Sequence, residues 1–175
     1  LDLLVNGQST FDAIFDAIKR AESYILVQFY IIHDDELGQR FKALLEEKAR
    51  NGVRVNLLYD EIGSHKTSSR YWDEMREAGV QAYSFHTTRG PGNRFQLNFR
   101  NHRKIVVIDG HTAFVGGHNV GDEYLGNTRK FKVWRDTHVR IVGPAVLGVR
   151  LSFAKDWYWA TRELYELDLT VPEPA

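Results

Sequence analysis

The sequence predicts an α/β fold, in which a mixed, mostly parallel β-sheet is flanked by helices. Apolar runs such as Tyr24–Ile32 are short and nearly continuous, as expected of strands that are buried on both faces. Segments with a helical period of apolar residues alternate with these runs. The pair Asp109-Gly110 lies between two further apolar runs and indicates a hairpin. Strands that alternate with helices, together with one hairpin, predict a mixed sheet covered by helices.

The first half of the chain is expected to alternate helix and strand. Ser9 or Thr10 can cap a helix whose apolar positions, from Phe11 to Ile18, follow the 3.6-residue period. The run Tyr24–Ile32 then forms a strand. The next elements are expected to be a helix at Leu37–Arg50, a strand at Val53–Tyr59, a helix at Tyr71–Glu77 and a strand at Val80–Phe85.

The second half begins with a polar stretch, Thr87–Arg100, which contains Gly90-Pro91-Gly92 and is expected to be an irregular loop. The hairpin strands Lys104–Ile108 and Thr112–Val115 follow. A last strand is expected at Thr137–Val142. Pro144 then opens a helix that runs to about Glu163.

Length and composition fit one globular domain. The 175 residues can bury a sizeable core, and 43% of them are hydrophobic. Basic and acidic residues balance at 23 each, which argues against a nucleic-acid partner, since such domains usually carry a basic excess. We expect one domain at residues 1–170, and residues 171–175 as the start of a linker.

Several kinds of site are excluded or disfavoured. The chain has no cysteine, which excludes disulfides, thiol catalysis and Cys-based zinc sites. No motif such as H-E-x-x-H supports a metal site, and we expect no cofactor. No apolar run approaches the roughly 20 residues that a membrane span needs, so this piece of chain is expected to be soluble.

The residues that suggest chemistry are His102 and Lys104. Two positions apart on a strand, they would share one face, and Arg103 between them would point the other way. A neutral imidazole beside a fixed ammonium suits phosphate chemistry, because the ammonium can hold a phosphoryl oxygen while the ring attacks phosphorus. By themselves, however, such residues are more often a solvated sheet face, and Asp109-Gly110 more often only a turn.

The longer string removes much of this ambiguity. The pattern H-x-K-x4-D-x6-G-G-x-N, from His102 to Asn119, is matched at every specified position and resembles the signature of the phospholipase D superfamily. The resemblance implies a metal-independent, two-step phosphodiester transfer through a phosphohistidine. His102 would be the nucleophile or its acid/base partner, and Lys104 would hold the phosphate.

Site residues follow from this resemblance. The expected catalytic residues are His102, Lys104 and Asp109. The expected substrate-binding residues are Asn119, Gly117 and Arg103. The expected supporting residues are Glu61, Asp136 and Glu123. Asn119 offers a donor and an acceptor, and a carboxylate such as Glu61 or Asp136 could orient a catalytic side chain or form only a structural contact.

The resemblance extends further than the signature, because several segments resemble the N-terminal catalytic half of bacterial cardiolipin synthases. They are Asp35–Gly38, Leu58–Ser64, Asn98–Lys104, Gly121–Tyr124 and Trp134–Val139. This resemblance implies phosphatidylglycerol or a related anionic phospholipid as substrate, contact with a membrane surface, and location at the bacterial cytoplasmic membrane. Basic residues before the signature, including Arg89, Arg94 and Arg100, would attract lipid headgroups.

Only one signature occurs in this chain, whereas the family has two per site. Either a second half lies elsewhere in the polypeptide, or two copies of this chain complete the site. Two other functions remain open: a single-signature nuclease or phosphodiesterase that acts as a homodimer, and a non-catalytic domain that retains the fold. Activity on phosphatidylglycerol but not on DNA would distinguish them.

Overall fold

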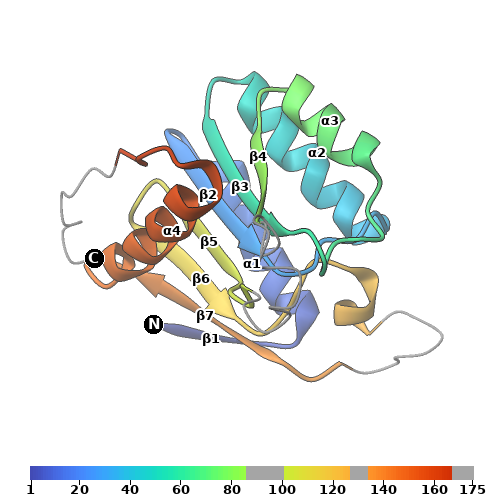
Figure 1. The fold of residues 1–175 in the computed structure, drawn as a ribbon. Helices are drawn as coiled ribbons and strands as arrows, with labels where there is room; N and C mark the ends of the chain where they lie inside the picture. Colours follow the sequence, from blue (N-terminus) through green and yellow to red (C-terminus); the bar gives the residue numbers. More distant parts are fainter. Residues whose placement is uncertain (86–100, 127–133, 167–175) are drawn as a thin grey trace, which may run out of the picture.

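The computed structural model describes residues 1–85, 101–126 and 134–166, and it places a seven-stranded sheet at the centre of the molecule (Figure 1). The strands occur in the order β1-β7-β6-β5-β2-β3-β4. Their bounds are β1 Asp2–Val5, β2 Tyr24–Phe29, β3 Arg54–Asp60, β4 Gln81–Phe85, β5 Ile105–Ile108, β6 Thr112–Gly116 and β7 Thr137–Val142. The helices are α1 Gly7–Arg20, α2 Glu36–Arg50, α3 Ser69–Glu77 and α4 Val146–Thr161, with a short 3-10 helix, η2, at Asp122–Leu125.

The mixed sheet and its flanking helices confirm the expected fold class, but the sheet is less parallel than expected. Only β2, β3 and β4 pair in parallel, because helices connect them. The pairs β2–β5, β5–β6, β6–β7 and β7–β1 are antiparallel. The second half of the chain therefore contributes more than the single predicted hairpin, since β7 returns beside β6 and the N-terminal strand pairs with β7.

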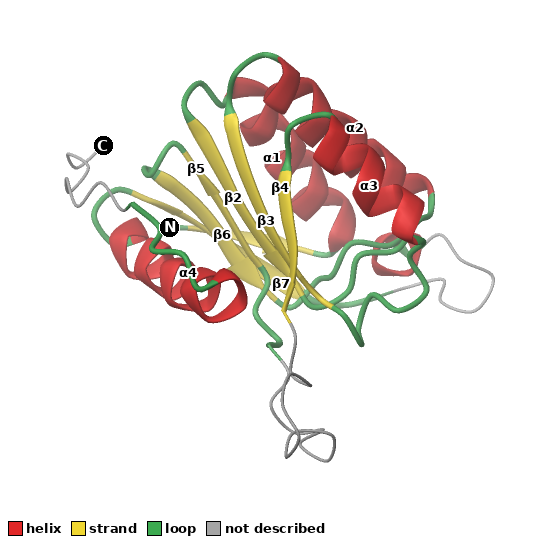
Figure 2. Cartoon of the chain, turned by 45° about the horizontal axis from the view of Figure 1, so that its top comes forward, coloured by secondary structure: helices red, strands yellow, loops and turns green. Residues whose placement is uncertain are grey.

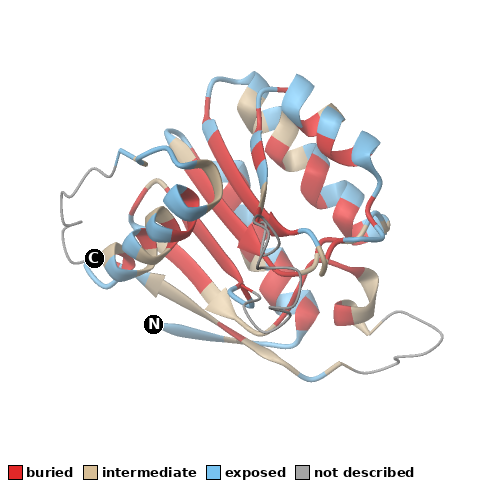
Figure 3. Ribbon diagram, viewed as in Figure 1, coloured by how far each residue is buried: buried red, intermediate tan, exposed pale blue. Residues whose placement is uncertain are grey.

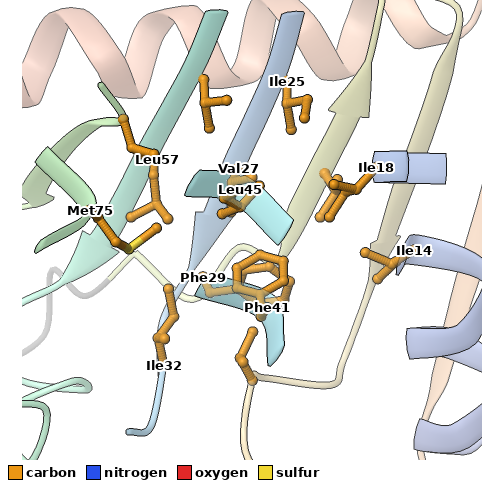
Figure 4. Packing of buried hydrophobic residues seen from close by; sticks show 14 of the residues in the cluster. Ile14, Ile18, Ile25, Val27, Phe29, Ile32, Phe41, Leu45, Leu57 and Met75 are labelled. Carbon is orange, nitrogen blue, oxygen red and sulfur yellow. The ribbon is translucent and has the colours of Figure 1, made fainter. Parts of the chain in front are cut away.

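Helices cover both faces of the sheet (Figure 2). The larger core contains apolar residues of α1, α2 and α3 packed on the sheet, among them Ile14, Ile18, Phe41, Leu45 and Met75 (Figure 4). A smaller core on the other face contains Phe153 and Trp157 of α4. The strands β2, β3 and β5 are buried along nearly their whole length, as Figure 3 shows. This burial explains why their sequences are continuous apolar runs.

Helix and strand ends differ from the predictions in a few places. The strand β1 was not predicted, because its Leu3 is exposed and its four residues carry no clear alternation. Neither Ser9 nor Thr10 caps α1. The helix begins earlier, after Asn6, and the Thr10 hydroxyl instead donates to the Asn6 carbonyl at 2.9 Å. The expected loop Thr87–Arg100 lies outside the described residues.

The Asp109-Gly110 turn is formed as predicted and joins β5 to β6. Both are central residues of a turn that the His111 backbone N–H closes by donating to the Ile108 carbonyl at 3.2 Å, and both have positive φ, 49° and 74°, as in a type I′ turn. Among the described residues, no helix combines the length and the apolar character that crossing a bilayer requires.

Candidate active site

Several strands of the sheet end or begin at the same end of the sheet, where the carboxyl ends of β2 and β3 lie; this end is called the site edge. His102 and Lys104 lie there. The strand β5 runs antiparallel to β2, so its first residue, Ile105, pairs with Gln28 near the carboxyl end of β2. The strand β6 ends at this edge with Gly116, and β7 begins there opposite it, with His138 in register. The carboxyl ends of the parallel strands β2 and β3 meet at the same edge. Such edges are where α/β proteins place their sites.

His102 and Lys104 are neighbours around the ring of Tyr30, which directly follows β2. The His102 ring stacks on the Tyr30 ring with a centroid distance of 4.0 Å and an angle of 30°. The Lys104 Nζ lies 5.6 Å from the Tyr30 ring centroid and donates a hydrogen bond to the His102 carbonyl at 2.6 Å. Lys104 is buried, whereas His102 is exposed. The structure therefore gathers an accessible imidazole and a fixed ammonium.

Asn101 and Arg103 point towards α4, whereas His102 and Lys104 lie at Tyr30. The side chains therefore alternate as predicted, although β5 begins only at Ile105. Asp156 of α4 is buried, and its Oδ2 accepts hydrogen bonds from Asn101 Nδ2 at 2.6 Å and Arg103 Nη1 at 2.6 Å. The same oxygen accepts a bond from Gln28 Nε2 at 2.8 Å. This shared carboxylate anchors the segment before β5 to α4. It also turns Arg103, expected to bind substrate, towards α4 rather than towards His102.

A carboxylate lies near Lys104. Burial lowers the pKa of the Lys104 ammonium, and the charge of Asp136, just before β7, partly opposes this effect. Asp136 Oδ1 accepts a hydrogen bond from the Thr137 backbone at 2.7 Å. Gly117 leaves room for this carboxylate, because a β-carbon at residue 117 would overlap with it. Gly117 thus acts through Asp136 in this structure, and the roles expected of Gly117 in substrate binding and of Asp136 in support stay predictions.

Two histidines that the sequence analysis did not select are buried beside these residues. His118 and His138 are 0% and 1% exposed, and their Nδ1 atoms lie 3.1 Å apart. Burial and the neighbouring His118 together lower the pKa of His138 to about 3, although Asp136 opposes this effect. Burial also lowers the pKa of His118. Both rings are therefore neutral at pH 7, and one proton can lie between them.

The only sequence signal for this pair was the glycine opposite His138. A β-carbon at residue 116 would overlap with the His138 ring, so Gly116 makes room for it. The pairing partner of β6 was not known from the sequence, and this relation could not be recognised there.

Asn119 is buried, and both ends of its amide have partners within the protein. Its Oδ1 accepts from the Ile31 backbone at 3.0 Å, and its Nδ2 donates to the Tyr124 hydroxyl at 3.1 Å. Asn119 therefore ties the chain after β2 to η2. In this structure Asn119 holds the segment next to Tyr30, and its role at the phosphate stays a prediction.

Asp109 is not part of the group around His102. It lies at the opposite end of β5, about 16 Å along the chain from Lys104 at some 3.3 Å per residue. Its carboxylate accepts hydrogen bonds from the backbone N–H groups of Glu22, Ser23 and Tyr24 at 2.8–2.9 Å. The geometry therefore gives Asp109 a structural role in fixing the start of β2 and places it away from His102, and its catalytic role stays a prediction.

The two expected glutamates differ in position. Glu61 directly follows β3, at the same edge as His102, and is exposed. Glu123 lies in η2, where its Oε1 is 3.8 Å from His33 Nε2. Within residues 1–85, 101–126 and 134–166, no three His, Asp or Glu side chains are grouped so that they could hold a metal ion.

Comparison with known proteins gives a family match. The family described as "Cardiolipin synthase, PLD-like domain" matches residues 14–145. Cardiolipin synthase A of Pseudomonas fluorescens Pf-5 is 59% identical over 167 residues, which cover 95% of this chain and 35% of that protein. Cardiolipin synthase A of Pseudomonas putida GB-1 is 58% identical with the same coverage. The chain thus spans about a third of the length of these relatives.

Solved structures share the fold at low sequence identity. Phosphatidylserine synthase of Haemophilus influenzae Rd KW20 has a TM-score of 0.69 and 19% identity, and the match covers 99% of this chain and 40% of that one. NucT of Helicobacter pylori has a TM-score of 0.67 and 15% identity, with 91% and 96% covered. Nuc of Salmonella typhimurium, a phospholipase D family member, has a TM-score of 0.65 and 15% identity, with 95% and 99% covered.

Proposed function

Because this chain belongs to the cardiolipin synthase, PLD-like domain family, we propose that it is one catalytic half of a phosphatidyltransferase. The substrate would be phosphatidylglycerol or a related anionic phospholipid. In the proposed reaction, the phosphatidyl group of one phosphatidylglycerol passes to a hydroxyl of a second, which gives cardiolipin and glycerol.

The observation that supports this proposal most directly is the pairing of His102 and Lys104 around Tyr30. The imidazole is exposed and can meet a phosphodiester, while the ammonium beside it is buried and held in place. A positive charge fixed in a partly water-excluded position stabilises the phosphoryl oxygens as they gain negative charge. The nearby Asp136 favours the charged form of Lys104, which that task requires.

The reaction would proceed in two balanced steps. A ring nitrogen of His102 donates its lone pair to phosphorus as the bond from phosphorus to the glycerol oxygen breaks, and a second histidine gives that oxygen a proton. The hydroxyl of the second lipid then attacks the phosphohistidine and loses its proton to the same base. The N–P bond breaks, and the lone pair returns to His102. The two histidines can also exchange roles, so that His102 acts as the acid and base and the second histidine as the nucleophile. The same bonds and protons are then transferred.

The second histidine would come from another phospholipase D-like half, either in the same polypeptide or in a second copy of this chain. The neutral, buried His118 and His138 are poorly placed for that role because neither is accessible to a lipid. We further propose that the full-length protein works at the bacterial cytoplasmic membrane. Three of the basic residues expected to meet lipid headgroups, Arg89, Arg94 and Arg100, lie outside the described part of the chain.

The test is to trap the intermediate in the full-length protein. Brief reaction with phosphate-labelled phosphatidylglycerol, quenched in base because phosphohistidine is acid-labile, should leave label on a peptide that contains His102. His102→Ala should abolish turnover while the fold remains intact. The matched control is His111→Ala, since His111 is exposed and lies at the opposite end of the sheet.

The outcomes separate the possibilities. Turnover of His102→Ala within tenfold of wild type would contradict the catalytic assignment. Label found only on the second half would give His102 the acid/base role, and label on neither histidine would contradict the two-step mechanism.

The homodimer alternative also has a supporting observation. This chain matches 96% and 99% of the NucT and Nuc chains, so a chain of this size can make up nearly the whole of a protein with this fold. If the chain acts as such a homodimeric nuclease or phosphodiesterase, it should cleave DNA or a simple phosphodiester without any further half. Turnover of phosphatidylglycerol with no activity on DNA would exclude the nuclease.

A further inference from the structure

Tyr30 is the residue that both His102 and Lys104 meet, and neither the signature nor the composition singles it out. The residue is 8% exposed, and its ring stacks on the His102 ring at 4.0 Å. The Lys104 ammonium lies 5.6 Å from the centroid of the same ring. An aromatic face within about 6 Å of a cation attracts it through the negative potential of the π system. Tyr30 is thus within range of two groups that carry positive charge during the proposed reaction.

The segment that carries Tyr30 is fixed from several directions. The next residue, Ile31, donates its backbone N–H to Asn119, and its carbonyl accepts from the backbone of Val120 at 3.1 Å. The Ser64 hydroxyl donates to the Tyr30 carbonyl at 3.3 Å. A β-carbon at Gly63 would overlap with this carbonyl and approach the Tyr30 ring. Such a supported ring can hold its stacking partner in one plane.

We infer that Tyr30 is a positioning residue that fixes the plane of the His102 ring and stabilises the positive charge this ring acquires during transfer. The inference rests on the proposed function, since it requires His102 to react with phosphorus or to exchange a proton with the substrate. It adds a third member to the His102 and Lys104 pair and assigns it a task that differs from theirs.

The chemistry explains why the effect would appear in the rate. When a neutral imidazole donates its lone pair to phosphorus, the N–P bond forms, the P–O bond to the leaving glycerol breaks, and the ring is left with a positive charge. If His102 instead acts as the base, its ring gains the same charge with the proton of the acceptor hydroxyl. In nucleophilic attack and in the base step, the attraction to the Tyr30 face is stronger in the transition state than before the step. As the acid of the first step His102 would lose this charge, so the inference applies to His102 as the nucleophile or as the base of a rate-limiting second step. Interactions of this kind raise kcat rather than lower KM.

The test varies the charge of the aromatic face while its shape stays nearly constant. In the full-length protein, position 30 would carry in turn tyrosine, phenylalanine, and phenylalanine with one, two and three ring fluorines, which withdraw electron density from the face. Tyr30→Phe should keep kcat within about threefold, because the face remains. The logarithm of kcat should then fall steadily with each added fluorine, so that kcat decreases roughly tenfold over the series. KM should stay within about twofold.

Two controls separate this role from a merely structural one. The same series at Tyr158, which is exposed on α4 and 47% accessible, should leave kcat unchanged. Tyr30→Leu removes the face and should lower kcat at least as much as the most fluorinated variant. The Tm of Tyr30→Leu should be measured together with the Tm values of the fluorinated proteins. The fluorinated proteins should have the same Tm as Tyr30→Phe.

A series in which kcat does not change with fluorination would overturn the inference. A large loss of kcat in Tyr30→Phe would overturn it too, because the hydroxyl and not the face would then be responsible. Label trapped on a histidine together with an unchanging series would refute the inference and leave the proposed function intact. No label on any histidine would refute both.

Discussion

At the residue scale, the candidate site separates side chains that meet the substrate from side chains that build the site. His102 is accessible and Lys104 beside it is proposed to hold the phosphate, whereas Asn119, His118 and His138 are buried within the protein. The polar atoms of the buried residues are largely engaged with one another or with the backbone. A substitution among them should therefore act on stability or on charge rather than on direct contact with lipid.

Asp109 provides a direct case. Asp109→Asn keeps the left-handed turn conformation, which asparagine tolerates, but removes the charge that accepts three backbone N–H groups. We expect the free energy of unfolding to fall by about 2 kcal/mol and kcat/KM of the folded protein to stay within about threefold. Urea denaturation and a lipid transfer assay measure these quantities. Asp16→Asn, an exposed helix carboxylate, is the control and should cost less than about 0.5 kcal/mol.

The opposite result is equally informative. If Asp109→Asn unfolds at the same urea concentration as wild type but loses most of its activity, Asp109 acts in catalysis as the signature suggests, and the structural role inferred from its hydrogen bonds is wrong.

His138 predicts a dependence of stability on pH. Its pKa is about 3 in the folded protein and near 6.5 in the unfolded chain, so between these values the unfolded chain binds the additional proton. Stability from this residue is complete above pH 6.5 and is lost progressively as the pH falls, by at most about 1.4 kcal/mol per pH unit. Urea midpoints measured between pH 7.5 and 5 should fall steeply for wild type and less steeply for His138→Asn.

The exposed His111 serves as the control for this measurement. His111→Asn should keep the slope of the wild-type protein, and a wild-type slope in His138→Asn would show that the buried pair does not govern acid sensitivity.

At the element scale, the junction between β6 and β7 shapes the surroundings of Lys104. Gly116 makes room for His138 and Gly117 for Asp136, so two consecutive glycines let β7 approach the end of β6. Glycine is required here by contact with neighbouring atoms and not by an unusual backbone conformation, because neither residue has a positive φ.

Gly117→Ala should therefore displace the Asp136 carboxylate from its position near Lys104. We expect kcat to fall by at least about tenfold, because the charge that supports the ammonium is moved. Gly148→Ala on α4 is the matched control. No atom lies near the added methyl group, and alanine should stabilise the helix by about 0.5–1 kcal/mol without loss of activity. Equal activity of the two variants would contradict the role assigned to Gly117.

At the scale of the whole molecule, the proposed mechanism takes the positive charge for the phosphate from lysine side chains, Lys104 in this chain and one in the proposed counterpart. Activity on a soluble, short-chain substrate should therefore survive a strong chelator at the wild-type rate. A soluble substrate is needed because divalent ions also alter lipid surfaces. Loss of activity on chelation, restored by a divalent ion, would contradict the proposed mechanism.

Much of the architecture could be predicted because local patterns determine it. The apolar runs of β2 and β3, the turn at Asp109-Gly110 and the alternation from Asn101 to Lys104 are readable within a few residues. The pairing of His118 with His138 and the stacking of Tyr30 on His102 could not be predicted. They depend on which strands lie side by side, and the residues concerned are 20 and 72 positions apart in the chain. The hydrogen bonds of Asp109 to the start of β2 could not be predicted either, because the signature records identity without position.

The anchoring of Asn101 and Arg103 to Asp156 has a consequence for how this segment can change. Residues 101 and 103 bind α4, whereas residues 102 and 104 face Tyr30. The alternation of side chains along the segment therefore matters as much as its composition. Deleting or inserting one residue between Asn101 and β5 would exchange the two sets and turn the imidazole towards α4. Exchanging Arg103 for another side chain would leave the alternation unchanged. The segment should therefore tolerate substitution at Arg103 far better than any change of its length.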